Sequence, residues 1–564
     1  MQSRQHWGIE LLGLEVCETA HRGDDDLLSA GLGLAGLQRP LPRPTSIAEC
    51  TPALLRRRAI HSNWNGIADL RDRDGAIGAA LAKPVPGREF HAALRLPGRR
   101  QGHRVMLQLP DDFDLERPCL IVTASSGSRG VYGAIALAGA FGLPRGHAVV
   151  YTDKACGSDW FDVDTGEAPD LAGLPTADPA RRLFVPPELR LPAHSVLTRH
   201  AHSQENPEAD WGAHLRQAAG FALAVLSREF AGRGPFTPDN TRVVAAGLSN
   251  GGGAVLQAAA DGEPWLRGAV AIAANVLPRR GGRAFYDYCS EAALWMRCAQ
   301  AAPALRGAPS PMPQAALDAM ADTELAGLGQ ANHLPRALRH GGAVAAYRLL
   351  RRRGWSAAML AAARISAAFD LWHAGSITYA SALGRFAADQ HPAGFRFAPV
   401  DAQGRPQPAS AVDRALWWSD SSGIVPGAGV GLVGDRSRAD ALIALRRLWS
   451  RRDADGQRLR AGVAETRVGP PRAGLPLLLV HGAMDGLIPA EFSSLSYLRQ
   501  ALAAGRAVSY WHVPRAAHFD AFLGFPGYGE RFRPLLPVAW QALAALLQNL
   551  DGAPLPEYRD RFAD

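Results

Sequence analysis

The chain has 564 residues, of which 47% are hydrophobic and 20% are charged. This balance is typical of a folded globular protein and excludes wholesale disorder, and the length exceeds what one minimal core needs. The net charge of +8 comes almost entirely from scattered arginines, because lysine occurs only at positions 83 and 154. We therefore expect no nucleic-acid partner.

Signals for export, membrane insertion and structural metal binding are missing from the sequence. Met1–Glu18 mixes charged and apolar residues and lacks the apolar run of a signal peptide, so we expect a cytoplasmic protein without a membrane span. The six cysteines form no C-x-x-C pair, which favours neither a zinc cluster nor a disulfide framework. Cys289 and Cys298 could pair in an oxidising compartment, but reduced thiols are the default expectation. Nothing in the sequence indicates an oligomeric state.

The first hundred residues are rich in Gly, Pro and Arg and contain only short helical patterns, as in Ala53–His61. We expect them to wrap around the rest of the protein, since their own core would be poor.

From residue 104 onwards, short apolar runs rich in β-branched residues alternate with amphipathic segments. The expected strands are Val105–Leu109, Cys119–Ala124, Ala148–Thr152, Arg242–Ala246, Gly268–Ala274, Leu475–Val480 and Val508–Val513. The expected helices are Val131–Ala140, Pro207–Phe230, Gly252–Ala260, Ala490–Ala504 and Val538–Leu550. This alternation predicts an α/β fold, with a mostly parallel sheet that is covered by helices on both faces.

Between residues 276 and 470 the alternation stops. This stretch is rich in Ala and Arg, with candidate helices over Pro313–Ala326 and Ala343–Ala368 and a segment rich in Trp and Gly over Trp417–Gly431. We expect it to form a helical lid over the site. The predicted organisation is an N-terminal segment (1–100), the first part of the core (101–275), the lid (276–470) and the second part of the core (471–564).

The sequence Gly247-Leu248-Ser249-Asn250-Gly251 matches the G-x-S-x-G pattern of a serine nucleophile. An apolar strand leads into it and a segment compatible with a helix follows, which is the strand–turn–helix setting of a nucleophile elbow. Glycines suit both sides of so tight a turn. We therefore predict that Ser249 is the nucleophile of a hydrolase.

A serine hydroxyl needs a base that is oriented by an acid, and in this fold the chain order is Ser, acid, His. Asp485 follows the predicted strand Leu475–Val480, and His518 follows the next strand, Val508–Val513. Because adjacent parallel strands deliver their ends to one edge of a sheet, we predict a Ser249–Asp485–His518 triad.

Four other residues compete for these roles. Asp520 lies too close to His518 in sequence to orient its ring, and Asp420 falls within the lid. His481 is better placed to support the Asp485 loop than to act as a base. His512 lies inside a strand, which favours a structural role.

The tetrahedral intermediate of ester hydrolysis needs two backbone N–H donors. Asn250, directly after the nucleophile, is one expected donor. The second should come from the Gly-rich loop after Cys119–Ala124, where Ser126 and Gly127 are the candidates.

The stretch His200–Gly212 holds two histidines and three acidic residues. Its H-x-H spacing would suit a metal site on a strand, but it precedes a predicted helix, which favours a structural loop or pocket wall. No phosphate-binding or dinucleotide motif is present, so we expect no metal and no cofactor.

Longer motifs give a more specific identification. Through them the chain resembles the D-(−)-3-hydroxybutyrate oligomer hydrolases, roughly over residues 20 to 555. The motifs are Arg22–Gly33, Gly127–Ile135, His200–Gly212, Ser249–Gly253, His481–Pro489 and His518–Leu523. Ser249 matches the nucleophile in the S-N-G-G-G motif of that family. The chain departs from the family in its shorter length, its Ala/Arg-rich lid and the lack of the leader found in some relatives.

The resemblance implies an α/β-hydrolase that cleaves dimers and short oligomers of (R)-3-hydroxybutyrate through an acyl-enzyme. The expected partner is thus a small ester that carries a carboxylate, and Arg129, in the Gly-Ser-Arg-Gly context, is the candidate to bind that carboxylate. Alternative functions are an esterase of the tannase and feruloyl-esterase type and a polymer depolymerase. A non-catalytic, granule-associated binding protein is the alternative from another class.

Overall fold

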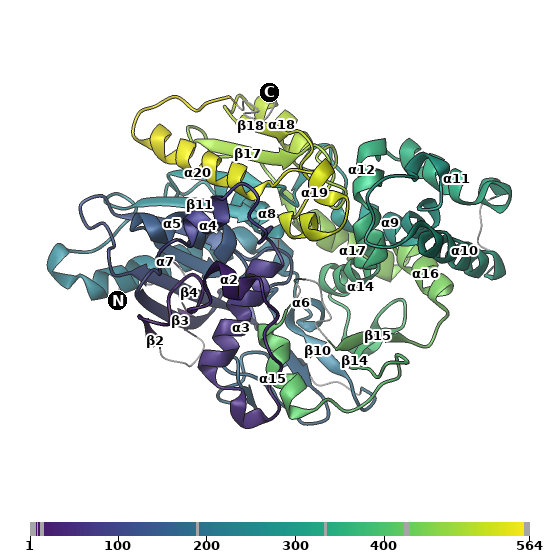
Figure 1. Ribbon diagram of the computed structural model, residues 1–564, viewed down its shortest axis with the longest axis horizontal. Coiled ribbons are helices and arrows are strands. Elements are labelled where there is room, and N and C mark those ends of the chain that lie inside the picture. Colours follow the sequence, from purple (N-terminus) through teal and green to yellow (C-terminus); the bar gives the residue numbers. More distant parts are fainter. Residues whose placement is uncertain are drawn as a thin grey trace.

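The computed structural model describes residues 7, 10–11, 16–187, 191–331, 336–421, 423 and 429–557, with the backbone alone over 336–340. Its larger part is built on a 10-stranded sheet in the order β1-β3-β4-β6-β5-β11-β12-β17-β18, with β2 paired to β3 (Figure 1). The strands are β1 (Glu10–Leu11), β2 (Cys17–His21), β3 (Gly87–Arg95), β4 (Gly102–Pro110), β5 (Cys119–Ala124), β6 (Ala148–Thr152), β11 (Arg242–Leu248), β12 (Gly268–Ile272), β17 (Leu477–Gly482) and β18 (Ser509–Val513).

From β6 to β18 all neighbouring strands pair in parallel, whereas β4 runs antiparallel to β6. An antiparallel strand beside a parallel sheet, with the order of β5 and β6 exchanged, is the topology of the α/β-hydrolase fold. The predicted fold class is thereby confirmed.

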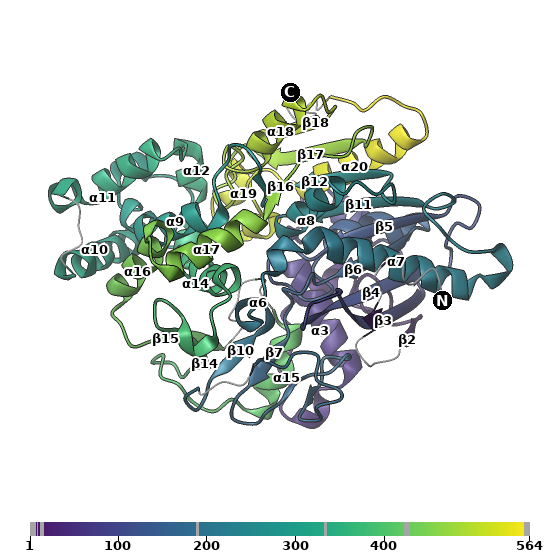
Figure 2. The same ribbon diagram turned by 180° about the vertical axis from the view of Figure 1, so that it is seen from behind.

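Helices cover both faces of this sheet, which explains why the central strands β5, β6, β12 and β17 are buried along their whole length. On one face Ile121, Val244 and Val270 belong to the same core as α3 (Pro52–Asn65) and α20 (Leu536–Leu550). The opposite face packs on α7 (Trp211–Glu229), α8 (Asn250–Ala259) and α18 (Ser494–Ala503), and α7 and α8 are seen in the view from behind (Figure 2).

The first hundred residues contribute more to the core than we expected. β3 lies within 1–100, yet it pairs with β4 along its whole length, from Gly87↔Pro110 to Arg95↔Gly102. The strand reads as polar in the sequence because it carries Glu89, a fully buried carboxylate that Arg56 contacts through two hydrogen bonds of 2.9 and 3.0 Å. Its counter-ion lies 33 residues away on α3, so the sequence pattern alone does not mark this strand as buried.

The lid region is mostly helical within its described residues. Its helices are α9 (Phe285–Ala299), α10 (Gln314–Gln330), α11 (Arg336–Arg352), α12 (Ala357–Ala362), α13 (Arg364–Ala368), α14 (Leu371–Gly384), α15 (Ala411–Ser419), α16 (Arg438–Ser450) and α17 (Ala454–Glu465). The continuous helix expected over Ala343–Ala368 is broken, with Gly354 in the left-handed region at φ +98°. Part of the segment Trp417–Gly431 lies outside the described residues.

A small antiparallel sheet of the order β15-β14-β10-β7 lies below these helices (Figure 1). β14 (Phe395–Pro399) and β15 (Val430–Gly434) belong to the lid region, whereas β7 (Trp160–Asp162) and β10 (Val196–Thr198) precede it in sequence. The lid is therefore joined to the segment between β6 and α7 by strand pairing. Among the described helices, none combines the length and the apolar character that a bilayer crossing requires.

Candidate active site

Ser249 sits on a sharp turn between β11 and α8. Its backbone adopts φ +60° and ψ −120°, a strained conformation for a residue other than glycine. Any Cβ on Gly247 would lie 2.2 Å from the carbonyl oxygen of Gly251, so the turn can close only with glycine there. This is the nucleophile elbow expected from the sequence.

The structure brings the three predicted residues of the triad into contact. His518 Nε2 lies 3.0 Å from Ser249 Oγ, and His518 Nδ1 lies 2.6 Å from Asp485 Oδ2. Asp485 follows β17 and His518 follows the adjacent parallel strand β18, so both come from the carboxyl ends of the sheet. The three side chains are at most 5% exposed, which removes competing water from their hydrogen bonds.

The surroundings of Asp485 keep it ionised. Its Oδ1 accepts hydrogen bonds from the backbone N–H groups of Leu487 (2.9 Å) and Ile488 (2.8 Å). Burial by itself raises the pKa of Asp485, but the charge of His518 and hydrogen bonds from His481 and His518 hold it well below its ordinary value. An anionic Asp485 holds the proton of His518 on Nδ1, which leaves Nε2 free to accept the proton of Ser249.

The competing residues have other partners. Asp520 accepts the N–H groups of Leu535 and Leu536, each at 2.7 Å, and does not orient His518. His481 accepts the hydroxyl of Ser494 at Nδ1 (2.6 Å), and its Nε2 lies 2.9 Å from the Ile488 carbonyl oxygen. As expected, His481 supports the Asp485 loop. His512 lies in β18, as expected.

The predicted donors of an oxyanion hole line the same pocket as Ser249. Asn250 begins α8, so its N–H is unused within the helix. The N–H of Ser126 donates to the Gly133 carbonyl over 3.5 Å, whereas among the described residues the N–H of Gly127 has no hydrogen-bond partner. Gly127 adopts φ +55°, and a Cβ there would lie 2.4 Å from the Gly423 carbonyl oxygen. This geometry favours Gly127 over Ser126 as the second donor.

Lys154 is a residue of the site that the sequence analysis missed. Its Nζ donates to the carbonyl oxygen of Gly127 (2.7 Å) and to Ser125 Oγ (2.8 Å) and is fully buried. Lys154 and Ala155 both adopt positive φ, +50° and +59°, so strained backbone delivers this ammonium. Burial lowers the pKa of Lys154. The available signal was composition, because an Arg-rich chain keeps only two lysines.

The histidines of the His200–Gly212 stretch do not act as a pair. His200 lies 2.6 Å from Ser128 Oγ through Nδ1 and 2.5 Å from Glu208 Oε1 through Nε2, whereas His202 accepts the N–H of Thr198. Burial lowers the pKa of His200, but Cys156 and Glu208 outweigh this effect and raise it to about 10.

The same cluster is the place where the described residues could hold a metal ion. Cys156, His200 and Glu208 each place one possible ligand atom within 4.8 Å of the others. Both nitrogens of His200 already make the hydrogen bonds described above, and Lys154 adds a cation beside Cys156 and Glu208. Through His200, the cluster contacts Ser128 in the Ser126–Arg129 loop.

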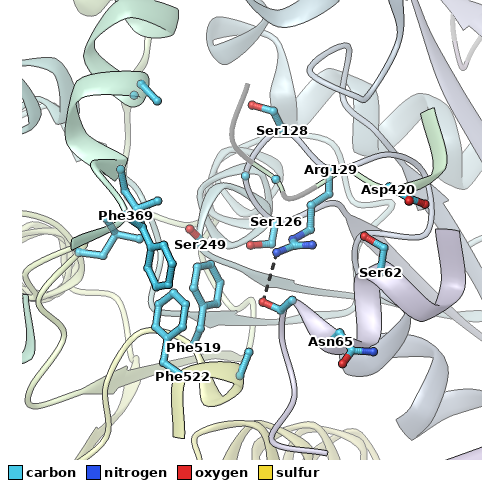
Figure 3. Close-up of a pocket in the computed structure, with 18 of the residues that line it drawn as sticks. Ser62, Asn65, Ser126, Ser128, Arg129, Ser249, Phe369, Asp420, Phe519 and Phe522 are labelled. Atoms are coloured by element: carbon cyan, nitrogen blue, oxygen red, sulfur yellow. Dashed lines mark hydrogen bonds between the residues drawn. The ribbon is translucent and has the colours of Figure 1, made fainter. Parts of the chain in front are cut away.

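A cavity of about 990 Å³ opens at Ser249. One wall is aromatic and includes Phe369, Phe519 and Phe522, whereas the other carries Arg129 and Asp420, with Ser249 between the two walls (Figure 3). Its volume is at the upper end of the range for small-molecule sites, so it suits a short flexible ligand better than a polymer surface.

Comparison with known proteins gives consistent results. A family description, "3HB-oligomer hydrolase (3HBOH)", matches residues 10–559. The D-(−)-3-hydroxybutyrate oligomer hydrolase of Paracidovorax citrulli is 34% identical over 624 residues, which cover 94% of this chain and 86% of the relative. The protein of the same name from Cupriavidus necator is 33% identical over 612 residues, 94% of this chain and 84% of the relative.

Among solved structures, the rice cell wall degrading esterase LipA from Xanthomonas oryzae aligns with this chain. The alignment covers 85% of this chain and 95% of the LipA chain. The sequence identity is 11% and the TM-score is 0.37. The assignment of the fold therefore rests on the strand order and not on this likeness.

Proposed function

The chain belongs to the 3HB-oligomer hydrolase family, and we propose that Ser249, His518 and Asp485 hydrolyse the ester bonds of short (R)-3-hydroxybutyrate oligomers through an acyl-enzyme. The observation that carries this proposal is the continuous hydrogen-bonded chain from Asp485 through His518 to Ser249 at the wall of the cavity. The proposed substrate is inferred from the names of the relatives.

In the acylation step, Ser249 Oγ attacks the ester carbonyl carbon while its proton moves to His518 Nε2. The N–H groups of Asn250 and Gly127 then stabilise the negative charge that forms on the carbonyl oxygen. Each such donor is typically worth about 3 kcal/mol in the transition state. When the intermediate collapses, the ester C–O bond breaks and His518 returns the proton to the departing alkoxide. The first product is thus the hydroxyl-bearing unit that also carries the free carboxylate.

In the deacylation step, His518 takes a proton from water, and the hydroxide attacks the acyl carbon. The Ser249 ester bond then breaks, and His518 protonates Ser249 Oγ. The second product is the acid that formed the hydroxyl end of the substrate. No metal or redox partner is required to balance either step.

The decisive experiment is hydrolysis of the (R)-3-hydroxybutyrate dimer and trimer by the purified protein beside Ser249→Ala. We expect fast release of monomer by the wild type and a loss of several orders of magnitude in the variant. Ser450→Ala, at the exposed end of α16, is the matched control and should keep full activity.

Methyl ferulate tests the aromatic-ester alternative in the same assay. Faster turnover of methyl ferulate than of the trimer would contradict the proposed substrate and leave Ser249 as the nucleophile. A wild type that cleaves no ester and does not react with an active-serine phosphonate would contradict the enzymatic function itself.

A further inference from the structure

Arg129 is a buried cation that forms no ion pair with any residue in the described part of the chain. Its side chain lines the cavity but is only 4% exposed, and its Nη2 donates to the carbonyl oxygen of Gly66 at 3.2 Å. Within the described part of the chain, Nη1 has no hydrogen-bond partner. Burial lowers the pKa of Arg129 to about 10, so the group is still charged at neutral pH. Because an uncompensated buried charge is costly, an anion bound here would be strongly favoured.

Two glycines lie directly against the side chain of Arg129, at positions where a larger residue would clash with it. A Cβ on Gly66 would lie 2.2–2.5 Å from Nη2, Nη1 and Cζ of Arg129. A Cβ on Gly423 would lie 2.8 Å from its Cγ and Nε. Gly66 directly follows α3, and Gly423 belongs to the lid region. The N-terminal segment and the lid region therefore both limit the space around this side chain.

The acidic residue on the same wall is already paired. Asp420 receives hydrogen bonds from Arg58 Nε (3.0 Å) and Arg58 Nη2 (2.6 Å). That pair is neutral, and Arg129 remains as an additional positive charge on this wall. An incoming carboxylate would therefore meet Arg129 without competition from Asp420.

The backbone of Arg129 also lies close to the proposed oxyanion donor. Its N–H donates to the carbonyl oxygen of Ser126 (3.2 Å), which closes a turn and keeps the two Cα atoms within about 7 Å of each other. Gly127, the favoured oxyanion donor, lies inside this turn. The aromatic wall lies on the other side of Ser249 (Figure 3). The acyl part of the substrate can thus lie along the aromatic wall, while the charged leaving unit lies along the wall that carries Arg129.

We propose that Arg129 binds the terminal carboxylate of the leaving unit, so that the enzyme removes single hydroxy acids from the carboxyl end of linear oligomers. This inference rests on the proposed function. The covalent steps are unchanged: the leaving alcohol is the hydroxyl of the last unit, and His518 protonates it while Arg129 holds its carboxylate. The acyl-enzyme then carries the remainder of the oligomer along the aromatic wall.

The first test compares the free dimer acid with its methyl ester, which removes the charge and retains the reacting bond. For the wild type we expect a higher kcat/KM for the acid. Arg129→Gln should lower kcat/KM for the acid by about 10- to 100-fold, the range for a charge-assisted hydrogen bond, and leave the methyl ester nearly unchanged. Arg129→Lys should retain part of the preference for the acid. Arg145→Gln, outside the cavity, is the control for loss of an arginine.

A second variant leaves Arg129 itself intact. Gly66 has an ordinary backbone conformation (φ −84°, ψ −10°), so alanine is tolerated there apart from its contact with the guanidinium. Gly66→Ala should displace the guanidinium and lower the preference for the acid as Arg129→Gln does. Gly232→Ala, where a Cβ meets no atom within 4 Å, should have no effect. Retained turnover of p-nitrophenyl butyrate shows that each variant is folded.

The third test uses a trimer that is isotopically labelled in its carboxyl-terminal unit. We expect labelled monomer and unlabelled dimer as the first products. Unlabelled monomer or labelled dimer as the first product would overturn the proposed direction. Equal losses on the acid and the methyl ester in Arg129→Gln would overturn carboxylate binding and leave the proposed function standing. Failure of the wild type to cleave any oligomer would instead overturn the proposed function.

Discussion

The ammonium of Lys154, which is fully buried, and the carbonyl oxygen of Gly127 are 2.7 Å apart. Lys154 follows β6 and Gly127 follows β5, the neighbouring strand in the sheet. The hydrogen bond therefore ties the loop that carries the proposed second oxyanion donor to the end of the neighbouring strand. Such preorganisation is what makes backbone donors effective, because they need not reorient during the reaction.

Removing this ammonium should impair the chemical step more than substrate binding. We expect Lys154→Met to lower kcat about tenfold or more with little change in KM, since the loop loses its anchor but the cavity walls remain. A boronate transition-state analogue should bind correspondingly less tightly, whereas the affinity for product should be unchanged.

Lys83→Met is the control, because Lys83 is the other lysine of the chain and is exposed. A purely structural role for Lys154 would lower the thermal stability and leave kcat of the folded fraction unchanged. That result would contradict the role assigned to the Lys154–Gly127 contact.

The two carboxylates near His518 should respond differently to the same substitution. Asp485→Asn should lower kcat by about 10³–10⁴-fold, because an amide no longer holds the proton on His518 Nδ1. Asp520→Asn should lower thermal stability, since one of the backbone N–H groups of Leu535 and Leu536 would face an amide N–H₂. Its kcat should stay within about tenfold of the wild type. Steady-state kinetics with a melting curve for each variant separates the two roles, and a larger loss of kcat in Asp520→Asn would refute the assignment of Asp485.

His200 should make folding stability depend on alkaline pH. Its pKa of about 10 in the folded state lies above the ordinary value of 6.5, so its stabilisation is complete below pH 6.5 and is lost as the pH rises through 10. The difference in the free energy of unfolding between wild type and His200→Gln should therefore shrink from pH 6 to pH 10, by up to about 1.4 kcal/mol per pH unit. Urea titrations at several pH values measure it.

His202 lies on the same short helix α6 (Arg199–His202). It is a useful control because its contribution to stability should depend on pH in the opposite direction. Burial lowers its pKa to about 3, so its stabilisation is present above pH 6.5 and is lost as the pH falls towards 3. The difference in the free energy of unfolding between wild type and His202→Gln should thus shrink as the pH is lowered. If the difference in the free energy of unfolding between wild type and His200→Gln does not depend on pH, His200 does not carry a charge in the folded protein.

The local sequence was sufficient to predict the α/β core and the position of Ser249. Buried strands, helix periods and the glycines around Ser249 act over a few residues, so their pattern survives in the linear sequence. Asp485 and His518 could be named because adjacent parallel strands deliver their loops to one edge of the sheet. Strand β3 was missed because its buried Glu89 is neutralised by Arg56, which is distant in sequence.

The remaining features of the site were decided by tertiary structure. Lys154 meets Gly127 across two strands, and the sequence gives no distance between them. The choice of Gly127 over Ser126 depends on which N–H lacks a partner among the described residues. The charge of Arg129 is not balanced by Asp420, because Asp420 is held by Arg58. Charge pairing and hydrogen-bond satisfaction are properties of groups that approach in space, so the linear order of residues determines which groups are present but not which of them remain unpaired.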